Sequence, residues 1–296
     1  MNWIASYFLK HQKYSYPDWT SIGQYIEGHY APEDSDKIWE QVIDIWTSTL
    51  AKEFHYQKSQ TSNFIIIHNA EQDFIDSYSL FLERCLSKIL TSLDNIAYKY
   101  SNEKLIILLV DSQDDYYEYI SHFYPDGEFG LSGGLFYKLG LGHFIIPHQE
   151  LWMLESITSH EMTHAVLNHL QLPVWIDEGL ATNIESAITG HPLDTSPEQT
   201  NKHIAYWNSQ NIQDFWSGKS FSNTDDGQNL SYHLAEFIIR SLARSYHAFA
   251  NFCNEAHYED AGQSAFLENF DMNLSELMTP LLGSGQWEPK PELWEQ

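Results

Sequence analysis

Cysteine is nearly absent from this sequence of 296 residues, which contains only Cys85 and Cys253. Neither belongs to a C-x-x-C pair or to another spacing that holds a metal ion. A framework of disulfide bonds and a cysteine-ligated zinc site are therefore both excluded. We expect the two cysteines to be ordinary, partly buried residues, which fits a reducing compartment.

Basic residues are also scarce. The chain has 15 lysines and arginines against 41 aspartates and glutamates, which gives a formal net charge of −26 at pH 7. Because phosphate groups are repelled by such a charge, we predict no nucleic-acid partner. The charge favours basic substrates, although solubility is a sufficient reason for it.

Long apolar runs are missing as well. No run reaches the roughly 20 residues of a membrane-spanning helix. The N-terminal MNWIASYFLKHQKYSY lacks the apolar core of a signal peptide. We therefore predict no membrane span and a cytoplasmic location, and leave open export by a route that needs no cleaved signal.

The residues that are present indicate a globular protein, with 43% hydrophobic and 15% aromatic content. Apolar runs predict strands at 64–67, 104–110 and 142–147. The second strand is apolar enough to be central, and the third suits a sheet edge because it ends in Pro147. Helical periodicity predicts helices at 2–12, 36–54, 70–98, 112–122 and 230–249. The expected fold class is α+β, mainly helical with a small mixed sheet.

Composition along the chain suggests four parts. We predict an N-terminal helical cap segment (1–60), a sheet-containing half of a catalytic domain (61–150), a helical half (151–282) and a C-terminal tail (283–296). The tail is rich in proline and is expected to be mobile. Residues 190–228 are polar and are expected to be irregular, and glycines at 127, 130, 133 and 134 predict a turn.

The clearest motif is residues 160–164, His-Glu-Met-Thr-His, which matches H-E-x-x-H. Residues four apart on a helix lie on one face, so the imidazoles of His160 and His164 can reach one metal ion. Glu161 lies close to that face and can hold a water that the metal polarises. Leucines and isoleucines at helical spacing on both sides of the motif support a helix.

A carboxylate that could serve as a third metal ligand, that of Glu178, follows the motif on the next predicted helix. Pro173 suits the start of a second helix, from which Glu178 would face back toward the first. Two histidines and one glutamate with an open fourth position form a common catalytic zinc set. Asp177 is either a surface residue or a partner that hydrogen-bonds a ligand imidazole and orients it.

These residues resemble the gluzincin metallopeptidases, and more narrowly the peptidase MA-like superfamily, in which HExxH is followed by W-x-x-E-G-[LF]-A on the next helix. Residues 175–181, Trp-Ile-Asp-Glu-Gly-Leu-Ala, match that segment. The resemblance implies one Zn²⁺ ion held by His160, His164 and Glu178, with Glu161 as the general base. It also implies a zincin-like domain in which a sheet-edge strand borders the metal cleft and binds an extended peptide.

Two narrower families fit less well. Large aminopeptidases have a longer spacing to the glutamate and a G-x-M-E-N motif, which this sequence lacks. Metzincins need Gly and His three and six positions after the second histidine, where this chain has Leu167 and Leu170. His169 lies about 140° round the helix from His164 and is expected to be a surface residue.

Hydrolysis also needs a donor that stabilises the oxyanion. The resemblance places a tyrosine near the start of the helix from residue 230, so Tyr232 is the first candidate. His233 is the adjacent alternative, and Tyr206 and His203 are more distant ones. The competing interpretation of Tyr232 is a residue of the core or of the cleft wall.

The sequence thus predicts a zinc metallopeptidase of the endopeptidase type with a peptide or protein substrate. One alternative is a metal-stabilised binding protein of the same fold that lacks peptidase activity. A second alternative is a metal-free protein that carries the motif by accident.

Overall fold

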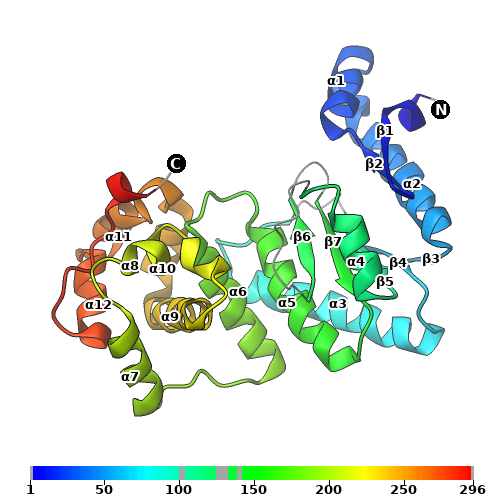
Figure 1. The fold of residues 1–296 in the computed structure, drawn as a ribbon. Helices are drawn as coiled ribbons and strands as arrows, with labels where there is room; N and C mark the ends of the chain where they lie inside the picture. Colours follow the sequence, from blue (N-terminus) through cyan, green and yellow to red (C-terminus); the bar gives the residue numbers. More distant parts are fainter. Residues whose placement is uncertain (1–2, 100–103, 125–132, 139–141, 295–296) are drawn as a thin grey trace. The chain divides into compact units, whose positions relative to one another are not determined.

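The computed structural model describes residues 3–99, 104–124, 133–138 and 142–294. The described chain divides into two compact units, of which the first comprises residues 1–84 and 100–161 and the second residues 85–99 and 162–296. The fold is α+β and mainly helical with a small mixed sheet, as predicted (Figure 1). Among the described residues, none of the helices combines the length and the apolar composition that a bilayer crossing demands.

A five-stranded sheet forms the centre of the first unit. Its order is β3-β4-β5-β7-β6, with β4, β5 and β7 parallel and the two outer strands antiparallel. The strands are β3 (Gln57–Gln60), β4 (Phe64–His68), β5 (Leu105–Val110), β6 (Leu135–Tyr137) and β7 (His143–Pro147). The all-apolar β5 is central, as predicted, because its side chains are buried on both faces of the sheet.

The prediction that 142–147 forms the edge strand is wrong. β7 lies between β5 and β6, and β6 is the edge strand on that side. Pro147 is tolerated because it is the last residue of β7, where its missing N–H costs little. The glycines at 127 and 130 lie outside the described residues, and those at 133 and 134 directly precede β6.

Both faces of the sheet are covered by helices. One face packs on α2 (Ser35–Phe54) and α4 (Gln113–Ile120), in a core that includes Trp46, Tyr119 and the sheet residues Ile67 and Leu108. On the other face, α3 (Gln72–Ser92) contacts α5 (Leu151–Leu167), where the Tyr78 hydroxyl lies 2.6 Å from that of Thr158. Strand alternation sends successive side chains into these two separate cores.

The N-terminal segment departs from its prediction. Residues 2–12 were expected to be helical, but a hairpin forms there from β1 (Phe8–His11) and β2 (Tyr14–Pro17), after a short 3-10 turn at Ile4–Tyr7. A helix that was not predicted, α1 (Trp19–His29), follows it. The Asp18 carboxylate caps this helix by accepting a hydrogen bond from the Ser21 N–H (3.0 Å).

The second unit is a helical assembly, with α6 (Val174–Thr189), α7 (Pro197–Tyr206), α8 (Ile212–Trp216), α9 (Asp226–Leu242), α10 (Tyr246–Glu255), α11 (Gln263–Phe270) and α12 (Leu274–Leu282). The helix predicted at 230–249 is divided between α9 and α10 by a 3-10 turn at Ala243–Ser245. Residues 190–228 are not irregular throughout, because α7 and α8 form there. Ser196 caps α7, and Pro197 occupies its first turn.

The tail after α12 is held to α8, contrary to the expected mobility. The Trp216 indole N–H donates to the Trp287 carbonyl (2.7 Å), and Trp287 itself is buried. The Gln213 amide donates to the Glu288 carbonyl (2.9 Å) and accepts from the Lys290 N–H (2.8 Å). Two tryptophans and one glutamine therefore order a segment whose composition alone suggests disorder.

Glycine at position 179 is required by the close approach of α6 and α9. A Cβ atom there would lie 2.6 Å from Ile239 Cγ1 and 2.8 Å from the Ala235 carbonyl oxygen. The carbonyl belongs to the backbone of α9 and cannot move without moving the helix. We expect Gly179→Ala to lower the free energy of unfolding by about 2 kcal/mol, as over-packing typically does, in urea titrations followed by circular dichroism.

Gly28→Ala is the matched control, since Gly28 is also helical and a Cβ atom there meets nothing within 4 Å. This change should leave stability unaltered or raise it by up to about 1 kcal/mol, because alanine favours the helix. Equal stability of both variants and the parent would contradict a rigid contact between α6 and α9.

Candidate metal centre

Helix α5 positions the first two candidate ligands. Its buried residues Leu154, Thr158, Met162 and Val166 recur every fourth position and fix the rotation of the helix. The same rotation leaves His160 and Glu161 half-buried, with His164 almost fully buried. The helix ends at Leu167, so His169 lies beyond it and is exposed, as predicted.

Helix α6 supplies the third candidate ligand. It begins after Pro173, as predicted, and carries Glu178 in its second turn. Ligand atoms of His160, His164 and Glu178 all lie within 4.8 Å of one another, and no second such group of three occurs among the described residues. The His164 Nε2 atom lies 3.6 Å from Glu178 Oε2. Two ligands of a tetrahedral zinc ion are about 3.3 Å apart, so this pair needs little movement.

Asp177 lies in ion-pair contact with a ligand imidazole, which fits one of its two predicted roles. Its Oδ1 atom lies 3.0 Å from Nδ1 of His164. This contact leaves Nε2, on the other side of the ring, as the His164 atom that faces Glu178. A carboxylate behind a metal-binding histidine fixes the tautomer and raises the basicity of the ring.

The two carboxylates also control the charge of His164. Burial lowers the pKa of His164, but Asp177 and Glu178 outweigh burial and hold the pKa well above its ordinary value. The metal-free imidazole is therefore protonated at neutral pH. A bound metal ion has to displace that proton, because a ligand imidazole must be neutral.

We therefore expect the apparent zinc affinity to rise with pH, by about tenfold per unit while the pH stays below the pKa of His164. A competition titration with a chelating dye between pH 6 and pH 8 measures this slope. Asp177→Asn removes the negative charge beside Nδ1, which lowers the pKa of His164, so its slope should be shallower. An affinity that does not change with pH in the parent protein would contradict a protonated His164.

The candidate general base is held by the edge strand. The Phe136 N–H of β6 donates a hydrogen bond to Oε2 of Glu161 (2.7 Å). Since a backbone amide has a fixed direction, this bond fixes the position of one carboxylate oxygen of Glu161. This contact could not be predicted, because every residue except proline has a backbone amide N–H and residue type therefore carries no sign of it.

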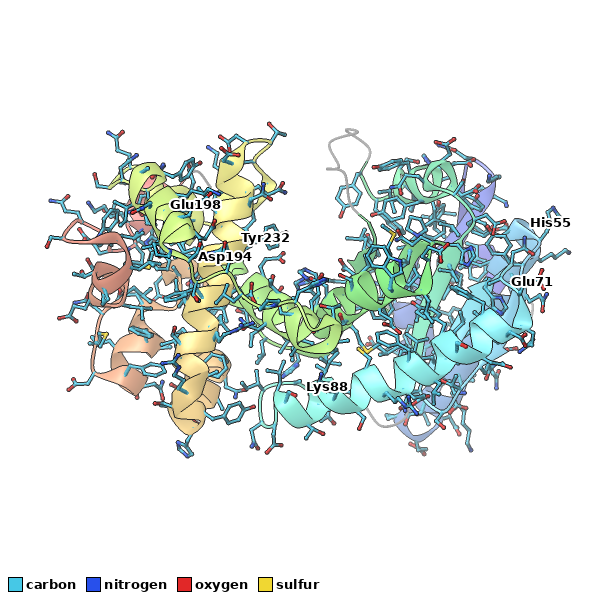
Figure 2. All side chains as sticks on the ribbon, turned by 90° about the horizontal axis from the view of Figure 1, so that it is seen from below. His55, Glu71, Lys88, Asp194, Glu198 and Tyr232 are labelled. Carbon is cyan, nitrogen blue, oxygen red and sulfur yellow. The ribbon has the colours of Figure 1, made fainter. Side chains whose placement is uncertain are left out.

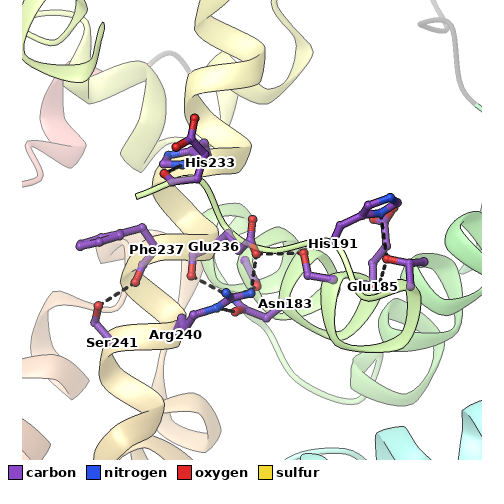
Figure 3. A network of polar contacts seen from close by, with 12 residues as sticks. Asn183, Glu185, His191, His233, Glu236, Phe237, Arg240 and Ser241 are labelled. Atoms are coloured by element: carbon purple, nitrogen blue, oxygen red, sulfur yellow. Dashed lines mark hydrogen bonds and ion pairs between the residues drawn. The ribbon is translucent and has the colours of Figure 1, made fainter. Parts of the chain in front are cut away.

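A polar network fastens α6 to α9 and so fixes the helix that carries Glu178 (Figure 3). The Asn183 amide donates to the carbonyls of Gly179 (2.7 Å) and Glu236 (2.9 Å). The buried Glu236 carboxylate accepts from Ser186 (2.9 Å) and from Arg240 (2.6 Å). The Arg240 Nε–H also donates to Asn183 Oδ1 (2.9 Å). Sequence reasoning missed this network, because its residues on α6 and α9 are far apart along the chain.

The four predicted oxyanion donors differ in what their polar atoms do. Burial, followed by the charge of His233, lowers the pKa of His203 to about 4, so its ring is neutral. Its Nδ1 accepts from the Trp207 indole (3.0 Å), so the ring proton is on Nε2, which donates to His233 Nδ1 (2.8 Å). His233 Nε2 then donates to the Asp194 carbonyl (2.8 Å). Both histidines therefore have both ring nitrogens bonded within the protein.

Tyr232 differs from the other three candidates in its position on α9. It lies on α9 (Figure 2), three and seven residues before Ala235 and Ile239, which contact α6 at Gly179. Helical periodicity therefore puts Tyr232 on the stripe of α9 that faces α6. The Tyr232 ring also packs edge-to-face against the Phe221 ring, with the two ring centroids 5.2 Å apart. Tyr206 is on α7, with its hydroxyl against Gly227.

Comparison with known proteins adds no relative. No family model matches this chain, and the curated proteins contain no similar sequence. A function of this chain is therefore inferred from the chemistry of the residues described above.

Proposed function

We propose that this protein is a zinc-dependent metallopeptidase of the gluzincin type that cleaves peptide bonds within a chain. The observation that supports the proposal most is the convergence of His160, His164 and Glu178 to within 4.8 Å. Two imidazole nitrogens and one carboxylate oxygen are the donor set of a catalytic zinc site, which keeps a fourth position for water. When bound there, a zinc ion would lower the pKa of that water and polarise the substrate carbonyl.

Residues of the chain carry out proton transfer, orient His164 and stabilise the oxyanion. Glu161 takes the proton of the attacking water and passes it to the leaving nitrogen, while the Phe136 N–H holds its second oxygen in place. Asp177 orients His164 through the 3.0 Å contact on Nδ1. Tyr232 donates its phenolic proton in a hydrogen bond to the developing oxyanion.

Incubation with a denatured mixture of cellular proteins tests the proposal and identifies the cleavage sites by mass spectrometry. We expect new termini inside the substrate chains that disappear with a chelator and return with added zinc. Trimming from the N-terminus alone would indicate an aminopeptidase. Zinc that binds without any cleavage would support the metal-stabilised binding protein, and a protein without zinc affinity would contradict both.

A further inference from the structure

A second feature of the first unit is a cavity of about 640 Å³ lined mainly by aromatic residues. Trp19, Trp39 and Trp46 line it from α1 and α2, and Tyr119, Phe123 and Tyr137 line it from α4, the residues after α4, and β6. We call this cavity the aromatic pocket. It shares no residue with the group formed by His160, His164 and Glu178.

The rings of the aromatic pocket are fixed by one another. Trp46 is fully buried, and its ring centroid lies 5.0 Å from that of Trp19 in an edge-to-face contact. The rings of Phe123 and Tyr137 are stacked, with centroids 3.7 Å apart. Trp19, Trp39, Phe123 and Tyr137 are half-buried, so part of each residue is accessible to solvent.

Two of the hydroxyls beside these rings, those of Tyr16 and Tyr119, are already bonded to the protein. The Tyr16 hydroxyl donates to the Tyr119 carbonyl (2.8 Å), and the Tyr119 hydroxyl lies 3.0 Å from Nε2 of the buried His143. A carbohydrate site needs several directed donors and acceptors around its aromatic platform. The aromatic pocket instead offers ring faces, which attract cations through their negative quadrupole.

Asp18 is the acidic residue of the described lining. The same lining contains two histidines, His122 and His143, and no lysine or arginine. The Asp18 carboxylate accepts two bonds from Ser21, to the backbone N–H (3.0 Å) and to the hydroxyl (2.7 Å), and a carboxylate has about four acceptor positions. The net charge of −26 further attracts positively charged ligands.

From this combination we propose that the aromatic pocket binds a small organic cation of the quaternary ammonium type. The ring faces of Trp19, Trp39 and Phe123 contact the cationic head, and Asp18 supplies the counter-charge. The volume is in the range of small-molecule sites, so an apolar group attached to the cation also fits. This binding does not depend on zinc or on peptidase activity.

Calorimetric titration of the full chain with choline and with its uncharged isostere 3,3-dimethylbutan-1-ol tests the proposal. We expect saturable choline binding, with the neutral compound at least about tenfold weaker, because it keeps the shape and loses the cation–π attraction. The chelator EDTA should leave choline binding unchanged. Equal affinity of the two compounds, or no saturable choline binding, would overturn the proposal.

Three variants locate the binding. Trp19→Ala should weaken choline binding about tenfold by removing one ring face. Asp18→Asn removes the charge but keeps the cap of α1, because asparagine caps helices as well as aspartate does. It should weaken choline binding severalfold and reduce its salt dependence, even if Trp19→Ala fails to fold. Trp152→Ala is the control, since Trp152 is 63% exposed on α5 and does not line the pocket. Unchanged affinity in Asp18→Asn would contradict the role of its charge.

Discussion

Glu161→Gln is expected to lower the rate of peptide cleavage by about 10²–10⁴-fold while zinc stays bound. Glutamine has nearly the same shape and can still face the same water, but it cannot take a proton from it. The loss should appear in kcat with little change in KM, since the proton is transferred only as the reaction proceeds. Cleavage of a fluorogenic peptide measures the rate, and elemental analysis of the purified variant measures the zinc.

Glu155→Gln is the matched control for this variant. Glu155 is half-buried on the same helix α5 but is not part of the candidate metal group. Its replacement removes the same charge from the same helix and should leave both cleavage and zinc content unchanged. If Glu161→Gln remained fully active, Glu161 would not be the base; if it lost zinc as well, its effect on the rate would not isolate proton transfer.

The helices around the candidate metal centre could be predicted because their signals are local. Residues 151–167 repeat apolar positions at helical spacing, and Pro173 marks the start of α6. The central strand β5 is likewise evident from six consecutive apolar residues. Such signals lie within one turn or one strand, so they do not depend on what the element packs against.

The edge of the sheet could not be predicted, because it depends on pairing between separate segments. β7 ends in Pro147 and so resembles an edge strand, yet the three residues of β6 pair along its free side. The short β6 carries too few residues for a periodic signal. For the same reason the contact between Phe136 and Glu161 becomes visible only once the strand order is known.

The predictions for the N-terminal segment, which missed the hairpin and α1, were wrong for a different reason. The helix predicted at 2–12 ends before Tyr14 and Tyr16, but these two tyrosines pack in the core with α2 and α4 and pair β2 with β1, which decides for a hairpin. The helix α1 had usable signals, namely Asp18 at its cap and Ile22 and Ile26 one turn apart on its buried face. These were obscured by Gly23 and Gly28 within the same helix, since glycine lowers helix propensity.

The second large effect is expected for Glu178→Gln, which should weaken zinc binding at least about 100-fold. The glutamine carbonyl is a neutral and weaker ligand than a carboxylate, so the set of His160, His164 and Glu178 loses its one anionic donor. Cleavage at low zinc concentration should disappear with the metal. We expect the variant to fold, since Asp177 keeps its contact with His164 and the hydrogen bonds described between α6 and α9 do not involve residue 178.

Thermal unfolding with and without zinc measures this loss. A ligand at 100 times its Kd stabilises the folded state by about 2.7 kcal/mol, so zinc should raise the Tm of the parent by several degrees and leave that of Glu178→Gln nearly unchanged. Glu185→Gln is the control, because Glu185 lies two turns further along the same helix α6 and outside the metal group. The two variants carry the same change of charge on one helix. A zinc-induced shift that is lost only at position 178 therefore reports ligation, and an equal shift in all three proteins would remove Glu178 from the metal site.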